Sequence, residues 1–292
     1  MGQKNLGKQI WGFVSPIIVY YIALWIVQFV ATGYFLVQHI EEVQALTGTP
    51  EQVSYAALAI IYDDLLASTV IMMAAAAALS LPVLSFMMKR DRIQELVAGI
   101  LPNSKAPLSK YALIVGISAP FALGLNNLIL LSDLAAYSEI YQETAQTFYA
   151  NDFLVQLICL GIISPIAEEF IFRGLIYKRI RRNTKTPVRA MVYSGLAFGF
   201  YHGNLVQTIY GCLSGFLLAY IYEKYGSLKA PILAHVVMNL VALVLTEVNV
   251  FVWMFEDILR MGIITAACAT LASTMYLFIK KIDEKPLKCE AE

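Results

Sequence analysis

The sequence predicts an all-α fold, a polytopic integral membrane helical bundle that forms a single transmembrane domain over residues 1–292. Three observations predict it. Apolar residues make up 59% of the chain and charged residues only 14%, with a mean hydropathy of +0.66, whereas a soluble domain keeps roughly a quarter of its residues charged. The apolar residues gather in about eight long runs, and the basic residues gather between alternate runs. This composition excludes a cytosolic or secreted globular enzyme.

A spanning helix needs about 20 mostly apolar residues, and shorter ones occur inside a bundle. The first apolar run is too long for the core of a signal peptide, so we expect it to be a retained anchor. The fifth and seventh runs are the shortest. The eight predicted spans are residues 11–37, 65–88, 111–132, 153–177, 188–202, 205–222, 230–245 and 258–279.

Lysine and arginine predict the orientation, because short loops rich in them stay in the cytoplasm. Of the 21 basic residues, 19 lie on one side of the predicted spans. The opposite loops are acidic. Both termini are therefore predicted to be cytoplasmic, and the expected location is the plasma membrane of a prokaryote. The 19 residues are Lys4, Lys8, Lys89, Arg90, Arg92, Lys105, Lys110, Lys178, Arg179, Arg181, Arg182, Lys185, Arg189, Lys224, Lys229, Lys280, Lys281, Lys285 and Lys288.

Two connecting segments carry local signals. Apolar residues at helical spacing over residues 92–101 predict an interfacial amphipathic helix after the second span. Thr49, Pro50 and Gln52 form the pattern of a capping box with proline at the first helical position. The cysteines show no CxxC spacing, so we expect reduced thiols and no thiolate zinc site. They are Cys159, Cys212, Cys268 and Cys289.

The fourth predicted span contains three charged residues, Glu168, Glu169 and Arg173. A charge inside the membrane costs about 2.5 to 3.5 kcal/mol on insertion scales, so such residues indicate function by default. Glu169 and Arg173 are four residues apart and can pair on one helix face. Glu168 points about 100° away and needs a partner from another helix or from water.

Two of the three histidines also lie inside predicted spans. His202 ends the fifth span, and His235 lies four residues before Asn239 in the seventh, so these last two side chains share a helix face. Measured from the cytoplasmic basic residues at 1.5 Å per residue, the four polar groups fall in one layer of the inner to middle membrane. His39 lies in an outer acidic loop, and we expect no role for it in chemistry.

These residue types suit hydrolysis of an amide bond inside the membrane. A carboxylate in a low-dielectric site has a raised proton affinity, and Glu168 with His202 would form the pair that activates water. His235 and Asn239 can both donate hydrogen bonds to a developing oxyanion. The chain has no HExxH motif, and a zinc site would have to combine Glu168, His202 and His235 from separate helices. No metal is confidently predicted, and zinc is the metal that such a set would take.

At these residues the sequence resembles the CPBP family of intramembrane proteases, which includes type II CAAX prenyl proteases and bacteriocin-processing proteins and is also called the ABI family. The resemblance covers residues 153–245, the predicted catalytic core. It rests on three motifs that follow in the family's order: Glu168-Glu169-x-x-x-Arg173, Phe198-x-x-x-His202 and His235-x-x-x-Asn239.

The resemblance implies an endopeptidase in which Glu168 and His202 activate water and His235 and Asn239 stabilise the oxyanion. It implies supporting roles for Glu169, Arg173 and Phe198. Family members are often classed as metalloendopeptidases, although a glutamate-dependent mechanism without metal also explains the motifs. The expected partners are the lipid bilayer and a membrane-associated peptide or lipidated protein, with no nucleic acid. CAAX-type trimming and leader-peptide or bacteriocin processing both remain open.

Three other interpretations stay open at the level of sequence. The motifs could form the polar core of a non-catalytic membrane scaffold or bacteriocin self-immunity protein. Buried glutamate and histidine also serve as proton relays in transporters, but the chain shows no internal repeat of the kind expected there. A serine protease built on Ser214 is the least favoured, because small residues in that span are explained by close helix packing.

Overall fold

Every regular element in the described part of the chain is helical, as the sequence predicts. The computed structural model describes residues 6–101, 103–184 and 186–282. The helices are α1 (Leu6–Gln38), α2 (Ile40–Gln44), α3 (Pro50–Ile60), α4 (Tyr62–Ala67), α5 (Thr69–Val97), η1 (Leu108–Tyr111), α6 (Ala112–Leu131), α7 (Glu139–Tyr149), α8 (Phe153–Ile158), η2 (Cys159–Ile163), α9 (Ser164–Glu169), η3 (Phe170–Tyr177), α10 (Lys178–Asn183), α11 (Pro187–Phe200), α12 (Leu205–Tyr225), α13 (Lys229–Glu247), α14 (Val250–Phe255) and α15 (Ile258–Lys280). Lys4, Lys185, Lys285, Lys288 and Cys289, which entered the predictions above, lie outside the described residues.

Seven helical segments of the described chain are long and apolar enough to cross a membrane, one fewer than predicted. The difference is α11, which covers the predicted fifth span but has only 14 residues and is about 21 Å long. The apolar run ends there because Gly203 takes a left-handed φ of 77° and the Asn204 side chain caps α12 by accepting from Gln207 N. The other seven predicted spans correspond to helices. They are residues 10–38, 69–97, 108–131, 153–183, 205–225, 229–247 and 258–280.

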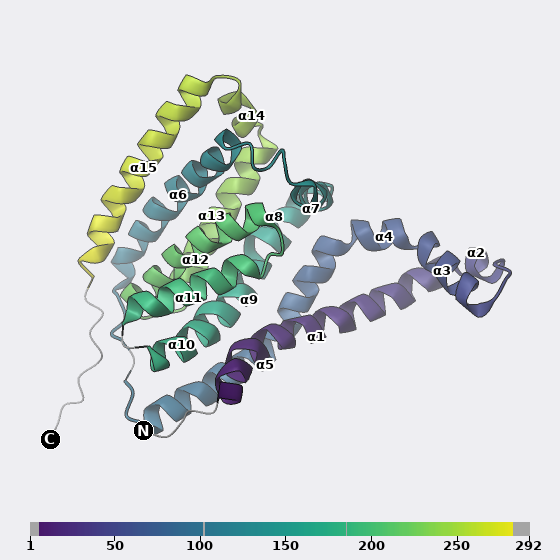
Figure 1. The fold of residues 1–292 in the computed structure, drawn as a ribbon, viewed down its shortest axis with the longest axis horizontal. Coiled ribbons are helices and arrows are strands. Elements are labelled where there is room, and N and C mark those ends of the chain that lie inside the picture. Colours follow the sequence, from purple (N-terminus) through teal and green to yellow (C-terminus); the bar gives the residue numbers. More distant parts are fainter. Residues whose placement is uncertain (1–5, 102, 185, 283–292) are drawn as a thin grey trace.

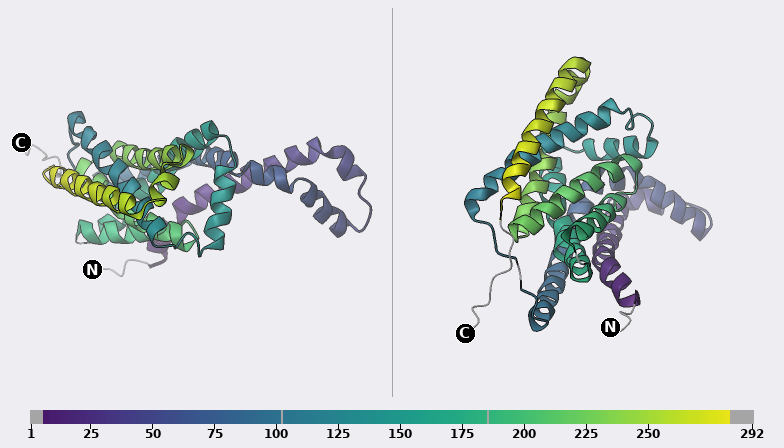
Figure 2. Two further views of the ribbon diagram at one scale, coloured as in Figure 1. Left: turned by 90° about the horizontal axis from the view of Figure 1, so that it is seen from above. Right: turned by 60° about the vertical axis from the view of Figure 1, so that its left-hand side comes forward.

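The helices form a bundle with one projecting arm (Figures 1 and 2). Helices α6, α11, α12, α13 and α15 pack side by side, and the segment from α8 to α10 crosses between them and α5. The main core draws its buried apolar residues from most of these helices and from α1 and α5. Helices α1 and α5 pack together and diverge toward α2, α3 and α4, which lie away from the bundle.

Residues 92–101 do not form the separate interfacial helix that the sequence predicts. Helix α5 continues without a break to Val97, and the two carboxylates of its last turns, Asp91 and Glu95, are buried. Asp91 lies 2.6 Å from Arg179 Nε, and Glu95 lies 3.9 Å from Arg182 Nε. The segment therefore uses its charges to hold α10, while its apolar residues face outward.

The capping box at the start of α3 is confirmed. Thr49 Oγ1 accepts from Gln52 N at 3.3 Å, and Gln52 Oε1 accepts from Thr49 N at 3.0 Å, with Pro50 as the first helical residue. The three cysteines inside the described chain, Cys159, Cys212 and Cys268, are free thiols as expected.

His39 joins two parts of the projecting arm. Its Nε2 lies 2.8 Å from Asp64 Oδ2 on α4, and its Nδ1 lies 3.1 Å from Glu42 Oε1 on α2. The hydrogen bonds to Glu42 and Asp64 raise the pKa of His39 above its ordinary value. The protonated ring can donate to both carboxylates at once, whereas the neutral ring has one N–H to donate.

We expect the arm to loosen as the pH rises. Because the folded-state pKa of His39 is raised, its stabilising contribution is complete below the unfolded-state pKa of about 6.5 and is lost as the pH rises through the folded-state pKa. Deuterium exchange of α2 to α4 should therefore be faster in His39→Gln than in the wild type at roughly pH 5.5, and nearly equal at roughly pH 8.5. A difference in exchange rate that stays constant across this pH range would contradict the role of protonated His39 in holding α2 to α4.

Candidate active site

The segment from Phe153 to Asn183 is one long helix whose backbone changes register around a proline. The π-helix η2 precedes Pro165, which is at the start of α9. Proline has no N–H, and in an i to i+5 register the carbonyl left without its donor is that of Leu160. Asn239 of α13 supplies the missing hydrogen bond, with Nδ2 donating to Leu160 O at 2.9 Å. The register change places the next turn, with both glutamates, against α13.

Glu169 and Arg173 form the predicted ion pair in the interior. Arg173 Nη1 donates to Glu169 Oε1 at 2.7 Å, and both side chains are 0% exposed. Arg173 Nη2 also donates to Gly215 O of α12 at 3.1 Å. Its guanidinium lies 4.5 Å from the centre of the Phe198 ring of α11, a cation–π contact. Arg173 thus contacts both of the other supporting positions, Glu169 and Phe198.

Glycines bring α11 and α12 close enough for this arrangement. A Cβ on Gly215 would lie 2.8 Å from the Cα of Gly195, and one on Gly211 would lie 2.9 Å from the Cα of Gly199. Neither position has room for a side chain. The adjacent Ser214 is 2% exposed, which agrees with a packing role and gives no support to a serine nucleophile.

His235 faces both glutamates. Its Nδ1 lies 2.9 Å from Glu169 Oε1, and the nitrogen must donate because an ionised carboxylate only accepts. Its Nε2 lies 3.7 Å from Glu168 Oε2. The Glu168 side chain is 19% exposed, in contrast to the fully buried Glu169, as expected for side chains 100° apart on a helix. The structure therefore places His235, rather than His202, directly beside Glu168.

His202 lies at the end of α11 on the other side of Phe198. Its Nδ1 donates to Phe198 O at 2.8 Å. The Phe198 ring centre is 5.0 Å from the ring centre of His202 and 5.5 Å from that of His235, with both pairs nearly perpendicular. The described chain shows no hydrogen bond or ion pair between Glu168 and His202. Phe198 keeps the two histidines in one layer but apart.

Two tyrosines near Glu168 were not predicted. Tyr20 of α1 is buried, and its ring centre lies 6.2 Å from that of Tyr201. Both phenols interact electrostatically with the Glu168 carboxylate. Tyr201 precedes His202, which is a signal that could have been used. For Tyr20 the sequence contains no signal, because its position depends on how α1 packs.

The three side chains that the sequence left open as a zinc set, Glu168, His202 and His235, do not converge on one point in this arrangement. Among residues 6–101, 103–184 and 186–282, no three His, Cys, Asp or Glu side chains are gathered as metal ligands. Glu168 and His235 are near each other, but His235 Nδ1 is bonded to Glu169 and His202 is bonded within its own helix.

The fold and site define a class: a polytopic helical membrane protein with a carboxylate–histidine–arginine centre at the contact of four helical segments. Residues 150–241 match the family model described as "Type II CAAX prenyl endopeptidase Rce1-like". All seven site residues named above lie within that segment. The resemblance to the CPBP and type II CAAX protease family is thus confirmed.

A curated relative agrees with this assignment. The chain is 31% identical over 85 residues to the Bacillus subtilis (strain 168) protein named "Putative membrane peptidase YdiL". The match covers 29% of this chain and 34% of that protein, so the chain matches about a third of the relative's length. No solved structure matches the chain significantly.

We expect Arg173→Ala to destabilise the protein. It leaves the carboxylate of Glu169 buried without its cation, a change that costs about 3–5 kcal/mol in comparable buried pairs. Thermal unfolding in detergent measures the loss, with Arg90→Ala as the control, because Arg90 is exposed on α5 and an exposed charge should contribute little. An unchanged melting temperature and yield for Arg173→Ala would refute the supporting role.

Asn239→Ala distinguishes a structural role of this side chain, the hydrogen bond to Leu160 O, from the oxyanion role. The contact with Leu160 O predicts a loss of stability of about 1–3 kcal/mol, since a buried carbonyl loses its donor. Asn151→Ala is the control, because its amide bonds only to Thr147 O of the preceding turn. Full stability with loss of peptide cleavage would instead establish the oxyanion role implied by the family resemblance.

Proposed function

We propose that the protein is an intramembrane endopeptidase that hydrolyses a peptide bond of a membrane-associated peptide or lipidated protein. The observation that supports it best is the pair of proton acceptors formed by Glu168 Oε2 and His235 Nε2, 3.7 Å apart. The family match and the relative's printed name, which says membrane peptidase, point to the same activity.

The hydrogen bonds around His235 determine what it can offer. Because Nδ1 donates to Glu169, neutral His235 carries its proton there and presents a lone pair at Nε2. Glu168 presents a second acceptor at a distance too long for a direct hydrogen bond. A water molecule between them can donate one hydrogen to each, which turns an oxygen lone pair outward. This orientation is that of a nucleophile.

Glu168 then serves as the general base. It accepts the proton as the water oxygen attacks the peptide carbonyl and transfers it to the leaving amine. The buried Glu169–Arg173 pair keeps His235 in one tautomer and one orientation, because the carboxylate that receives its N–H is itself fixed by the guanidinium. His202 and Asn239 stay assigned to water activation and the oxyanion on the family resemblance alone.

The substrate proposal follows from location. The site lies within helices that cross the membrane, so the scissile bond has to belong to a chain held at or in the bilayer. A CAAX-type protein is suggested by the family description, and processing of a leader peptide or bacteriocin fits the same chemistry. The plasma membrane is the proposed compartment, from the asymmetry of basic residues.

A scaffold or self-immunity role is the second candidate, since an ion pair such as Glu169–Arg173 stabilises a bundle without any catalysis. Glu168 separates the two interpretations. It is the member of the site with partial exposure, and the described chain provides no arginine or lysine partner for it. A purely structural carboxylate in this position would need such a partner.

The deciding experiment compares the protein termini in cells that carry wild-type protein, Glu168→Gln and Glu247→Gln at matched expression. Glu247 lies at the end of α13, away from the site, and serves as the charge-matched control. We expect specific new termini with wild type and Glu247→Gln, and a loss of at least about 100-fold with Glu168→Gln, the usual scale for a general base. His202→Ala and His235→Ala should abolish the same termini while inserting normally.

Identical termini in all strains, together with normal insertion and an unchanged phenotype, would contradict the protease and support the scaffold. The terminal sequences in the positive case identify the substrate and the cleaved bond.

A further inference from the structure

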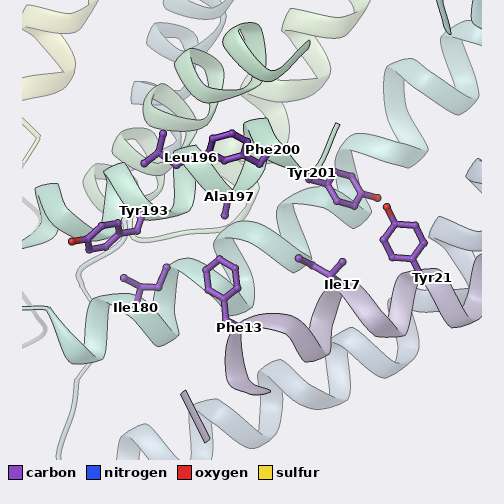
Figure 3. Close-up of a pocket in the computed structure, with 9 residues that line it drawn as sticks. All are labelled: Phe13, Ile17, Tyr21, Ile180, Tyr193, Leu196, Ala197, Phe200 and Tyr201. Atoms are coloured by element: carbon purple, nitrogen blue, oxygen red, sulfur yellow. The ribbon is translucent and has the colours of Figure 1, made fainter. Parts of the chain in front are cut away.

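A groove of about 720 Å³ opens between α1 and α11 (Figure 3). Each of the two helices lines it with residues spaced four apart, which lie on one face of the helix. Phe13, Ile17 and Tyr21 come from α1, and Tyr193, Ala197 and Tyr201 come from α11, with Ile180 of α10 between them. The lining residues are all aliphatic or aromatic, three of them tyrosines, and the volume is that of a small-molecule site.

The groove together with Arg189 matches one leaflet of a bilayer in length. The lining residues of α11 run from Tyr193 to Phe200, about 11 Å, and Arg189 lies one turn before them, so the two together cover about 17 Å, close to half of the roughly 30 Å hydrocarbon core. Helix α11 starts directly after the basic segment that predicts the cytoplasmic side, so the leaflet is the cytoplasmic one. A membrane-spanning helix is twice this length, whereas one lipid chain matches it.

A cation without a protein partner lies at the cytoplasmic end of the groove. Arg189 is exposed and lies one turn before Tyr193 on the same helix face. Lys178, Arg179, Arg181 and Arg182 all lie within 4.0 Å of a carboxylate oxygen, but no such pair is found for Arg189 within the described ranges. A guanidinium in this position suits a phosphate group, which it can bind through two parallel hydrogen bonds.

The groove is formed before any ligand arrives. Arg179 donates to Gly12 O at 2.5 Å and to Asp91 at 2.6 Å, and thereby ties the start of α1 to α10 and α5. Its Nη1 also lies 3.3 Å from Ser15 Oγ. Because the two walls are fixed at this end, binding needs little ordering of the protein.

We propose that this groove is a binding site for an anionic phospholipid of the cytoplasmic leaflet. One acyl chain lies between α1 and α11, and the phosphate lies on Arg189. The chain end reaches Tyr201, next to His202, so the bound lipid forms the membrane-side wall of the candidate active site. The proposal does not depend on hydrolysis, and its test does not measure cleavage.

The test uses the full chain in nanodiscs of phosphatidylcholine and phosphatidylglycerol, followed by detergent extraction and native mass spectrometry of the lipids that remain bound. The wild type should retain more phosphatidylglycerol than phosphatidylcholine. Arg189→Gln should reduce that preference about fivefold, as expected for one basic residue near an anionic surface. Arg90→Gln is the control, because Arg90 is exposed on α5 and does not line the groove.

A second pair of variants tests the chain site. Ala197→Trp fills the groove from α11, and Ile17→Trp fills it from the opposite wall, so that one of them is informative if the other fails to fold. Either should remove the retained lipid. Equal retention of both lipids by the wild type, an unchanged preference in Arg189→Gln, or normal retention in both tryptophan variants would each overturn the proposal.

Discussion

The buried Glu169–Arg173 ion pair is the interaction on which the rest of the site depends. Two opposite charges inside the membrane are tolerated only if their remaining hydrogen-bonding groups are used, and the helices around them are arranged to do so. Gly215 O of α12 and the Phe198 ring of α11 contact the guanidinium, and His235 of α13 contacts the carboxylate. One ion pair therefore relates four helical segments to one another.

The sequence predicted the features that follow from a single helix. The pairing of Glu169 with Arg173 and the divergence of Glu168 from Glu169 both follow from 3.6 residues per turn, and both are present. What it could not predict was the partner of Glu168, because this depends on how separate helices rotate against each other. The closeness of α11 and α12 at Gly195 and Gly215 turns the Phe198 face inward, and both histidines pack against its ring.

Two predictions at helix ends differ from the structure. The apolar run up to His202 predicts a short fifth span, and α11 ends two residues earlier at Phe200, before Gly203 and Asn204, with too few residues to count as a long membrane-spanning helix. On the cytoplasmic side, the pattern of residues 92–101 predicts a separate interfacial amphipathic helix. Asp91 and Glu95 instead join the end of α5 to α10, because Lys178, Arg179 and Arg182 of that helix pair with them. The first difference follows from residues next to the helix end, and the second from contacts with α10 that are distant in sequence.

The shortness of α11 has a consequence for hydration. Its end and the turn through Gly203 lie about 21 Å from the cytoplasmic start of the helix, at a depth where peptide groups outside helices are stable only if protein or water satisfies them. A helix that stops inside the bilayer leaves peptide groups at its end that need protein or water as a partner, and Tyr201 and His202 lie there. If the protein hydrolyses a peptide bond as proposed, this break in the secondary structure is also a place for water, the second substrate of that reaction.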